Sequence, residues 1–110
     1  MNYYEIEISN SFIKSYKFHI KKLELTFPRY AVKVSQMVRE EFKLIQLFPF
    51  SNHILQIPND SNIYRKVVID RKYHLIYTVR STTISVLYFS DGRQTPNTYF
   101  KLLDIFKSLN

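Results

Sequence analysis

The spacing of the apolar residues changes character near the middle of the chain, and this change limits the fold more than any other feature. Between Phe12 and Pro49, apolar residues recur three or four positions apart, which is the period of an amphipathic helix. From Ile63 to Ser90 the chain is instead rich in Val, Ile, Tyr and Thr, which favour strands. A chain of 110 residues with both patterns predicts a single α+β domain, residues 1–110, with helices packed on one face of a sheet.

Two apolar stripes predict two consecutive helices. The first helix follows Ser9, Asn10 and Ser11, whose side-chain oxygens can cap a helix start. The second begins near Pro28 and is closed by Pro49. Because the connection between them is short, we expect an antiparallel helical hairpin. The stripes consist of Phe12, Ile13, Tyr16, Ile20 and Leu23 in the first helix, and of Ala31, Val34, Val38, Phe42 and Ile45 in the second.

The remaining elements are predicted strands and one last helix. Residues 3–9 alternate between polar and apolar side chains, and residues 63–69, 72–80 and 83–90 form three further strand-like runs. Residues 49–62 are rich in Pro, Asn and Ser and are predicted to form a loop. Thr95-Pro96-Asn97 can start a final helix. The order predicts a mostly antiparallel sheet of about four strands.

Two-residue turns at Asp70-Arg71 and Ser81-Thr82 would join the last three strands as hairpins. This register pairs Val67 with His74, Arg65 with Ile76, Thr78 with Ser85, and His74 with Phe89. Alternation then sorts the side chains into two faces. The face expected to rest on the helices carries Val68, Leu75, Tyr77, Val79, Ile84, Val86 and Tyr88. The other face carries Arg65, Val67, His74, Ile76, Thr78, Arg80, Thr83, Ser85, Leu87 and Phe89.

Charge and composition narrow the function. The net charge of +7 favours a polyanionic partner such as nucleic acid or an acidic protein segment. The absence of cysteine excludes thiolate chemistry and fits a cytoplasmic location, and the presence of a single glycine excludes a glycine-rich phosphate loop. His19 and His53 have no second ligand at metal spacing, so no metal site is expected. Neither a signal peptide nor a membrane span is expected.

The second, mixed face of the predicted sheet combines cations, hydroxyls and aromatic rings. Such a surface suits a nucleotide chain or an acidic peptide. The alternative is that it is the ordinary solvent-facing side of a half-buried antiparallel sheet.

Three parts of the sequence resemble the RelE/ParE toxins. The stretch from Tyr64 to Val79 resembles their central hairpin, in which a Tyr-Arg opening and a Tyr-x-x-x-Tyr strand recur. The helical hairpin is similar to theirs in Pro28-Arg29-Tyr30-Ala31 and in the break Leu44-Ile45-Gln46-Leu47-Phe48-Pro49. The tail Asp91-Gly92-Arg93-Gln94-Thr95-Pro96 resembles the Asp-x-Arg-x-x-Pro signature of the ParE-like branch.

The resemblance to RelE-type toxins implies an endoribonuclease that cleaves mRNA on the ribosome. In that reaction a 2′-hydroxyl attacks the adjacent phosphate, cations stabilise the added charge, and an acid or base moves protons. By resemblance, Arg65 and Arg93 would clamp phosphate and His74 would act as general acid or base. Tyr99 would stack on a base or transfer a proton, and Arg80, Thr78 and Ser85 would add contacts to RNA or to an antitoxin. The structural alternatives are a pairing role for His74, an ion pair for Arg65 and burial of Tyr99 by the last helix.

ParE-type toxins are not nucleases, and the resemblance to them implies inhibition of DNA gyrase by protein contact. Val67 stands where RelE enzymes typically carry a second basic residue, and Asp91-Gly92-Arg93 is ParE-like, so the sequence favours this branch. The RelE-like nuclease is the alternative, and a small basic nucleic-acid-binding domain is a third. Either toxin implies an acidic antitoxin that folds as it wraps the domain, and no cofactor.

Overall fold

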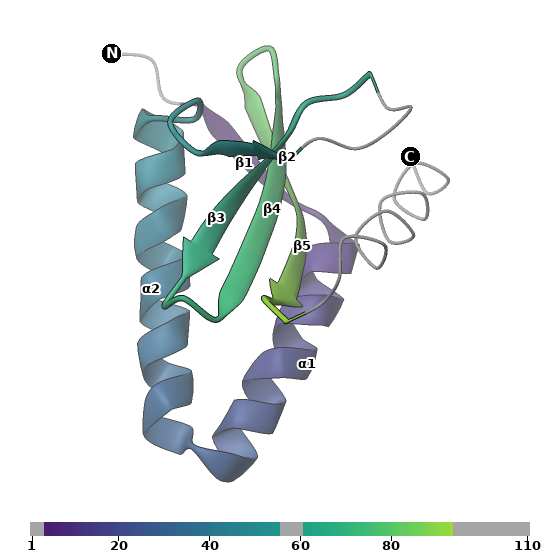
Figure 1. The fold of residues 1–110 in the computed structure, drawn as a ribbon. Coiled ribbons are helices and arrows are strands. Elements are labelled where there is room, and N and C mark those ends of the chain that lie inside the picture. The colour runs from purple at the N-terminus through teal and green to yellow at the C-terminus, as the bar shows by residue number, and fades with distance from the viewer. Residues whose placement is uncertain (1–3, 56–60, 94–110) are drawn as a thin grey trace.

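The computed structural model describes residues 4–55 and 61–93 of the chain. The strands form one five-stranded sheet in the order β1-β5-β4-β3-β2. Both helices cover the same face of this sheet and diverge from a junction at one end of the molecule (Figure 1). The predicted α+β architecture is confirmed. Its elements are β1 (Glu5–Ile8), α1 (Asn10–Thr26), α2 (Pro28–Leu47), β2 (His53–Leu55), β3 (Tyr64–Ile69), β4 (Tyr73–Arg80) and β5 (Thr83–Asp91).

Capping and proline chemistry set the limits of the helical hairpin, as predicted. The Ser9 hydroxyl accepts a hydrogen bond from the Phe12 amide at 3.0 Å and so caps α1. Phe27 alone separates the helices. Pro28 fixes the first turn of α2 and disfavours a helical conformation at the residue before it, so the chain must turn there.

The β3–β4 hairpin has a longer loop than predicted. Ile69 pairs with Tyr73, which leaves three residues in the loop instead of two. The predicted pairing of Val67 with His74 is therefore wrong. One extra loop residue shifts the register by one position, and every β3 side chain then lies on the opposite face from the one predicted.

The β4–β5 hairpin keeps the predicted register only near its turn. Thr78 pairs with Ser85, as predicted. A β-bulge then adds one residue to β5, so that His74 pairs with Ser90 instead of Phe89. The bulge exchanges the faces of the residues that follow it in β5.

Because of the longer loop and the bulge, five residues lie on the opposite face of the sheet from the one predicted. Arg65, Val67 and Phe89 lie on the face that packs on the helices, whereas Val68 and Tyr88 lie on the other face. The remaining face assignments from the sequence are confirmed.

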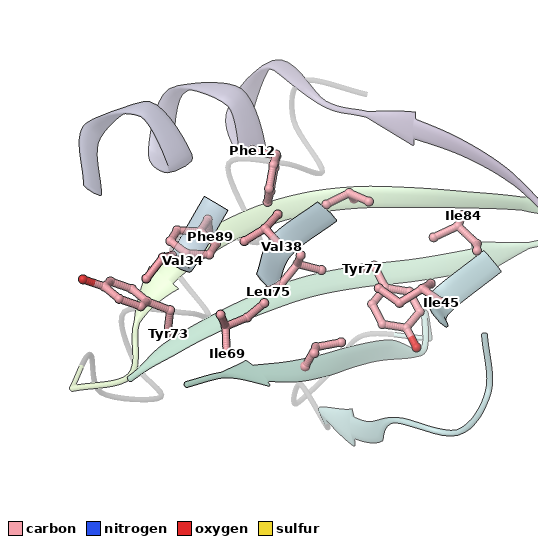
Figure 2. Close-up of a cluster of buried hydrophobic side chains, with 12 residues drawn as sticks. Phe12, Val34, Val38, Ile45, Ile69, Tyr73, Leu75, Tyr77, Ile84 and Phe89 are labelled. Carbon is pink, nitrogen blue, oxygen red and sulfur yellow. The ribbon is translucent and has the colours of Figure 1, made fainter. Parts of the chain in front are cut away.

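The core lies between the helices and the sheet (Figure 2). Phe89 of β5 stacks on Tyr73 of β4 and meets the edge of Tyr16 of α1, each with ring centroids 5.2 Å apart. Burying a large apolar side chain stabilises a fold by roughly 1.5–3 kcal/mol, so this layer holds the helical hairpin on the sheet. The buried cluster contains Phe12, Val34, Val38, Ile45, Val67, Ile69, Tyr73, Leu75, Tyr77, Ile84, Val86 and Phe89.

One predicted loop contains a strand, and the predicted final helix falls outside the residues that the structure describes. Strand β2 falls within residues 49–62, which the sequence predicted as loop, and pairs with β3 as a three-residue edge strand. The predicted final helix and Tyr99 lie outside the described residues. Neither described helix combines the length and the apolar character needed to cross a bilayer.

Candidate functional site

The outer face, defined as the side of the sheet away from α1 and α2, carries four of the predicted site residues. His74, Thr78 and Arg80 occupy alternate positions of β4, and Ser85 lies beside Thr78 on β5. Alternation along β4 is the physical reason why these side chains share a face. These four residues therefore share one face of the sheet, as predicted.

The centre of the outer face is apolar rather than cationic. Tyr64, Ile76 and Leu87 form a second buried cluster, and Leu55 and Tyr88 pack against it. Polar groups lie around this cluster, so the described outer face is divided instead of forming one continuous basic surface.

Thr78 and Arg80 use their polar atoms within the fold. The Thr78 hydroxyl is buried and donates to the Ile63 carbonyl at 2.8 Å. The exposed Arg80 guanidinium donates to the Asn62 side-chain oxygen at 3.4 Å. Both contacts hold the segment that leads into β3 beside β4.

Arg65 lies on the face opposite His74, because it pairs with Tyr77. Its guanidinium donates to the carbonyl oxygens of Phe50 at 3.0 Å and Asn52 at 2.8 Å. It also lies 5.3 Å from the Phe50 ring centroid, within range of a cation–π interaction. In this structure Arg65 fastens the segment after α2 to β3, and the expectation that it shares a surface with His74 is wrong.

His74 is half-buried on the outer face. Burial lowers the pKa of the imidazole below its usual value, and the neighbouring Lys66 ammonium lowers it further, whereas Asp91 opposes these effects. The neutral form therefore dominates near pH 7, and a neutral imidazole can accept a proton.

Arg93 lies just beyond β5 and is paired with Asp91. Its Nη2 atom is 2.8 Å from Asp91 Oδ2, and its Nε atom is 3.2 Å from Oδ1. This hydrogen-bonded pairing lowers the pKa of Asp91 to about 2. Asp91 thus serves as a carboxylate that positions Arg93.

The sequence did not point to a pocket beneath the β3–β4 loop. We call it the basic pocket. It encloses about 420 Å³ next to the helical junction, and the residues lining it include Phe27, Tyr30, Arg71, Lys72 and Arg93. The sequence assigned Arg71 to a turn and Lys72 to the start of a strand. Their proximity to the helical junction is a tertiary contact, which no local pattern reveals.

A hydrogen bond joins the β3–β4 loop to α2 beside the basic pocket. The Tyr30 hydroxyl donates to Asp70 Oδ2 at 2.7 Å, and the Lys33 ammonium lies 3.7 Å from Oδ1. Burial and this hydrogen bond raise the pKa of Tyr30, while the same bond is the main cause of the lowered pKa of Asp70. Tyr30 therefore remains a neutral donor and Asp70 an anion near pH 7.

Metal binding has no support in the described residues. Within residues 4–55 and 61–93, no group of three or more His, Cys, Asp or Glu side chains is placed to hold a metal ion.

Similarity to known proteins is found in the fold and not in the sequence. No protein-family model matches the chain, and no curated protein matches it in sequence. A chain from the chromosomal ParDE toxin–antitoxin system of P. aeruginosa superimposes with a TM-score of 0.64 at 14% identity, covering 80% of this chain and 95% of that one. A chain of the toxin–antitoxin complex RelBE2 from Mycobacterium tuberculosis gives a TM-score of 0.53 at 14% identity, covering 82% and 99%. The chain thus has the RelE/ParE fold.

Proposed function

We propose that the chain is the toxin of a toxin–antitoxin pair and that it inhibits DNA gyrase by protein contact, as ParE-type toxins are understood to do. The observation that carries the proposal is the fold it shares with a chain of the ParDE system over 95% of that chain. The net charge of +7 supports an acidic partner.

The positions of the candidate catalytic residues favour contact over catalysis. A nuclease that lacks a metal needs an acid or base and several cations around one phosphate, within hydrogen-bond reach. Arg65 is separated from His74 by the thickness of the sheet and donates to backbone carbonyls. Arg93 is bound to Asp91.

A RelE-like ribonuclease is the second candidate, and one observation favours it. His74 lies on the outer face with a lowered pKa and with the Lys66 ammonium near it. A neutral imidazole beside a cation is a suitable base next to a phosphate. If the chain is a ribonuclease of this kind, Arg65 stabilises the fold and does not contact the phosphate.

The implied partner is an acidic antitoxin whose apolar residues cover part of this domain. Exposed apolar side chains are available on the helical hairpin, including Phe18, Leu25 and Val32. A segment that folds on binding would offset part of the net charge of +7 and bury these side chains together.

Purified gyrase and translating ribosomes distinguish the candidates. We expect the protein to stabilise double-strand breaks in supercoiled plasmid in the presence of gyrase, and to leave mRNA intact on ribosomes. Cleaved mRNA with intact plasmid would overturn the gyrase target and favour the ribonuclease, and His74→Ala should then abolish cleavage.

Induced expression tests the toxin proposal itself. We expect growth arrest that is relieved by co-expression of the adjacent reading frame, and a stable complex of the two products. Normal growth together with nucleic-acid binding would instead support the plain binding domain.

A further inference from the structure

The basic pocket joins side chains from three separate parts of the chain. The Gly92 amide donates to the Lys72 carbonyl, so the end of β5 lies directly on the β3–β4 loop. A Cβ atom at residue 92 would lie only 2.8 Å from that carbonyl oxygen, which accounts for the chain's one glycine at this position. The close approach brings Lys72 and Arg93 to the same pocket, opposite the helical junction.

Positive charge exceeds negative charge in the lining of the pocket. Arg71, Lys72 and Arg93 line it, whereas Asp91 is the one carboxylate among its described lining residues. Arg71 forms no ion pair within the part of the chain that the structure describes. The Lys72 ammonium lies 4.7 Å from the Tyr30 ring centroid and has no carboxylate within ion-pair distance among the described residues. An anion entering the pocket would therefore meet Arg71 and Lys72 without a described ion-pair partner, whereas Arg93 is paired with Asp91 and the Asp70 carboxylate acts on Lys72 at longer range.

The helical junction supplies an aromatic wall to the same pocket. Phe27 is 65% exposed although it is a large apolar residue, because it lies at the turn between α1 and α2. The partly buried Tyr30 and the buried Tyr73 also line the pocket. Phe27 is thus the exposed ring of this wall, and an exposed aromatic ring beside cations can bind a nucleotide, since every base has a face that can stack.

We propose that the basic pocket binds a nucleotide, with the phosphate on Arg71, Lys72 and Arg93 and the base against the aromatic wall. A phosphate monoester carries about 1.5–2 negative charges at pH 7 and three acceptor oxygens, whereas a carboxylate carries one charge and two oxygens. Only the more highly charged group competes well with Asp91 for the Arg93 guanidinium. A volume of about 420 Å³ lies within the range of small-ligand sites.

This site lies apart from the outer face. Arg71 and Lys72 belong to the β3–β4 loop and are not among the residues considered above for action on gyrase or mRNA, whereas Arg93 is also one of the candidate nuclease residues. A chain that proves harmless to growth would still be expected to bind the nucleotide.

Calorimetric titration of the full chain tests the proposal, with adenosine 5′-monophosphate and a five-nucleotide single-stranded RNA that carries a 5′-phosphate as probes. Arg71→Gln and Lys72→Gln should each weaken binding about tenfold or more, as expected for loss of a charged contact to phosphate. Lys43→Gln is the matched control, because it removes the same charge from an exposed position near the other end of α2. In amide NMR spectra, the Lys72 and Gly92 signals should shift on addition of the monophosphate.

Comparison of the probes identifies the ligand. Tighter binding of the monophosphate than of the RNA indicates a free nucleotide, and the reverse indicates the 5′-terminal nucleotide of a strand. The proposal is overturned if neither binds at millimolar concentration, or if Lys43→Gln weakens binding as much as Lys72→Gln. It is equally overturned if inorganic phosphate binds as well as the monophosphate, or if only an acidic peptide of alternating Glu and Leu binds.

Discussion

Tyr77 shows how one hydroxyl connects the core to a surface segment. Its ring is completely buried beneath α2, and its hydroxyl donates to the Pro49 carbonyl at 2.7 Å. The same oxygen accepts a hydrogen bond from the Asn52 side chain at 3.1 Å. A buried aromatic residue thus fixes the start of the segment that leads from α2 to β2.

We expect Tyr77→Phe to lower the free energy of unfolding by about 1–3 kcal/mol, because the buried Pro49 carbonyl loses its donor. Urea denaturation measures the change. Tyr4→Phe is the matched control, since its hydroxyl forms no hydrogen bond among the described residues. Equal effects of the two substitutions would contradict the explanation.

Among the elements, β2 depends on a cation from its neighbour. Arg65 of β3 binds two carbonyl oxygens of the segment that precedes β2, and it covers the Phe50 ring. With only three residues, β2 forms few hydrogen bonds of its own. The guanidinium therefore stabilises the edge of the sheet, a role that accounts for a cation on the helix side.

Arg65→Met should increase hydrogen exchange at the amides of β2 and lower the free energy of unfolding by about 1–3 kcal/mol. Exchange monitored by NMR and urea denaturation measure the two effects. Unchanged exchange in β2 would contradict the structural role of Arg65.

The elements themselves could be predicted from the sequence, whereas the faces of the strands could not be predicted throughout. Ser9, Pro28 and the apolar stripes act locally and mark the helices correctly. Face assignment depends on counting residues across a loop, and Asp70-Arg71-Lys72 and the bulge in β5 each add one residue that no local pattern reveals. As a result, His74 was placed correctly and Arg65 was not. The basic pocket was missed because its residues meet only through tertiary packing.

The whole molecule contains two histidines that favour the neutral form when folded. Burial is the main cause of the lowered pKa of both His19 and His74. The ring of His19 lies 5.8 Å from those of Tyr73 and Phe89, between α1 and the sheet. Protonation of this histidine would place a charge at the contact between the two layers of the fold.

Stability should therefore decrease as the pH falls below about 6.5, the usual pKa of histidine. The unfolded chain takes up protons there before the folded chain does, and each unit by which a pKa is lowered contributes about 1.4 kcal/mol. Thermal melts from pH 8 to 5 measure the effect. The double variant His19→Gln, His74→Gln should show a flatter profile, and an unchanged slope would contradict this origin.

The first strand of the chain can complete its pairing only with one of the last. β1 lies parallel to β5, and the Ser9 hydroxyl reaches the Leu87 carbonyl, 78 positions later in the sequence. During synthesis the N-terminal strand must wait, unpaired, until nearly all of the domain has left the ribosome. A product truncated before β5 would therefore leave β1 without its partner strand, and this sheet can be completed only after β5 has been synthesised.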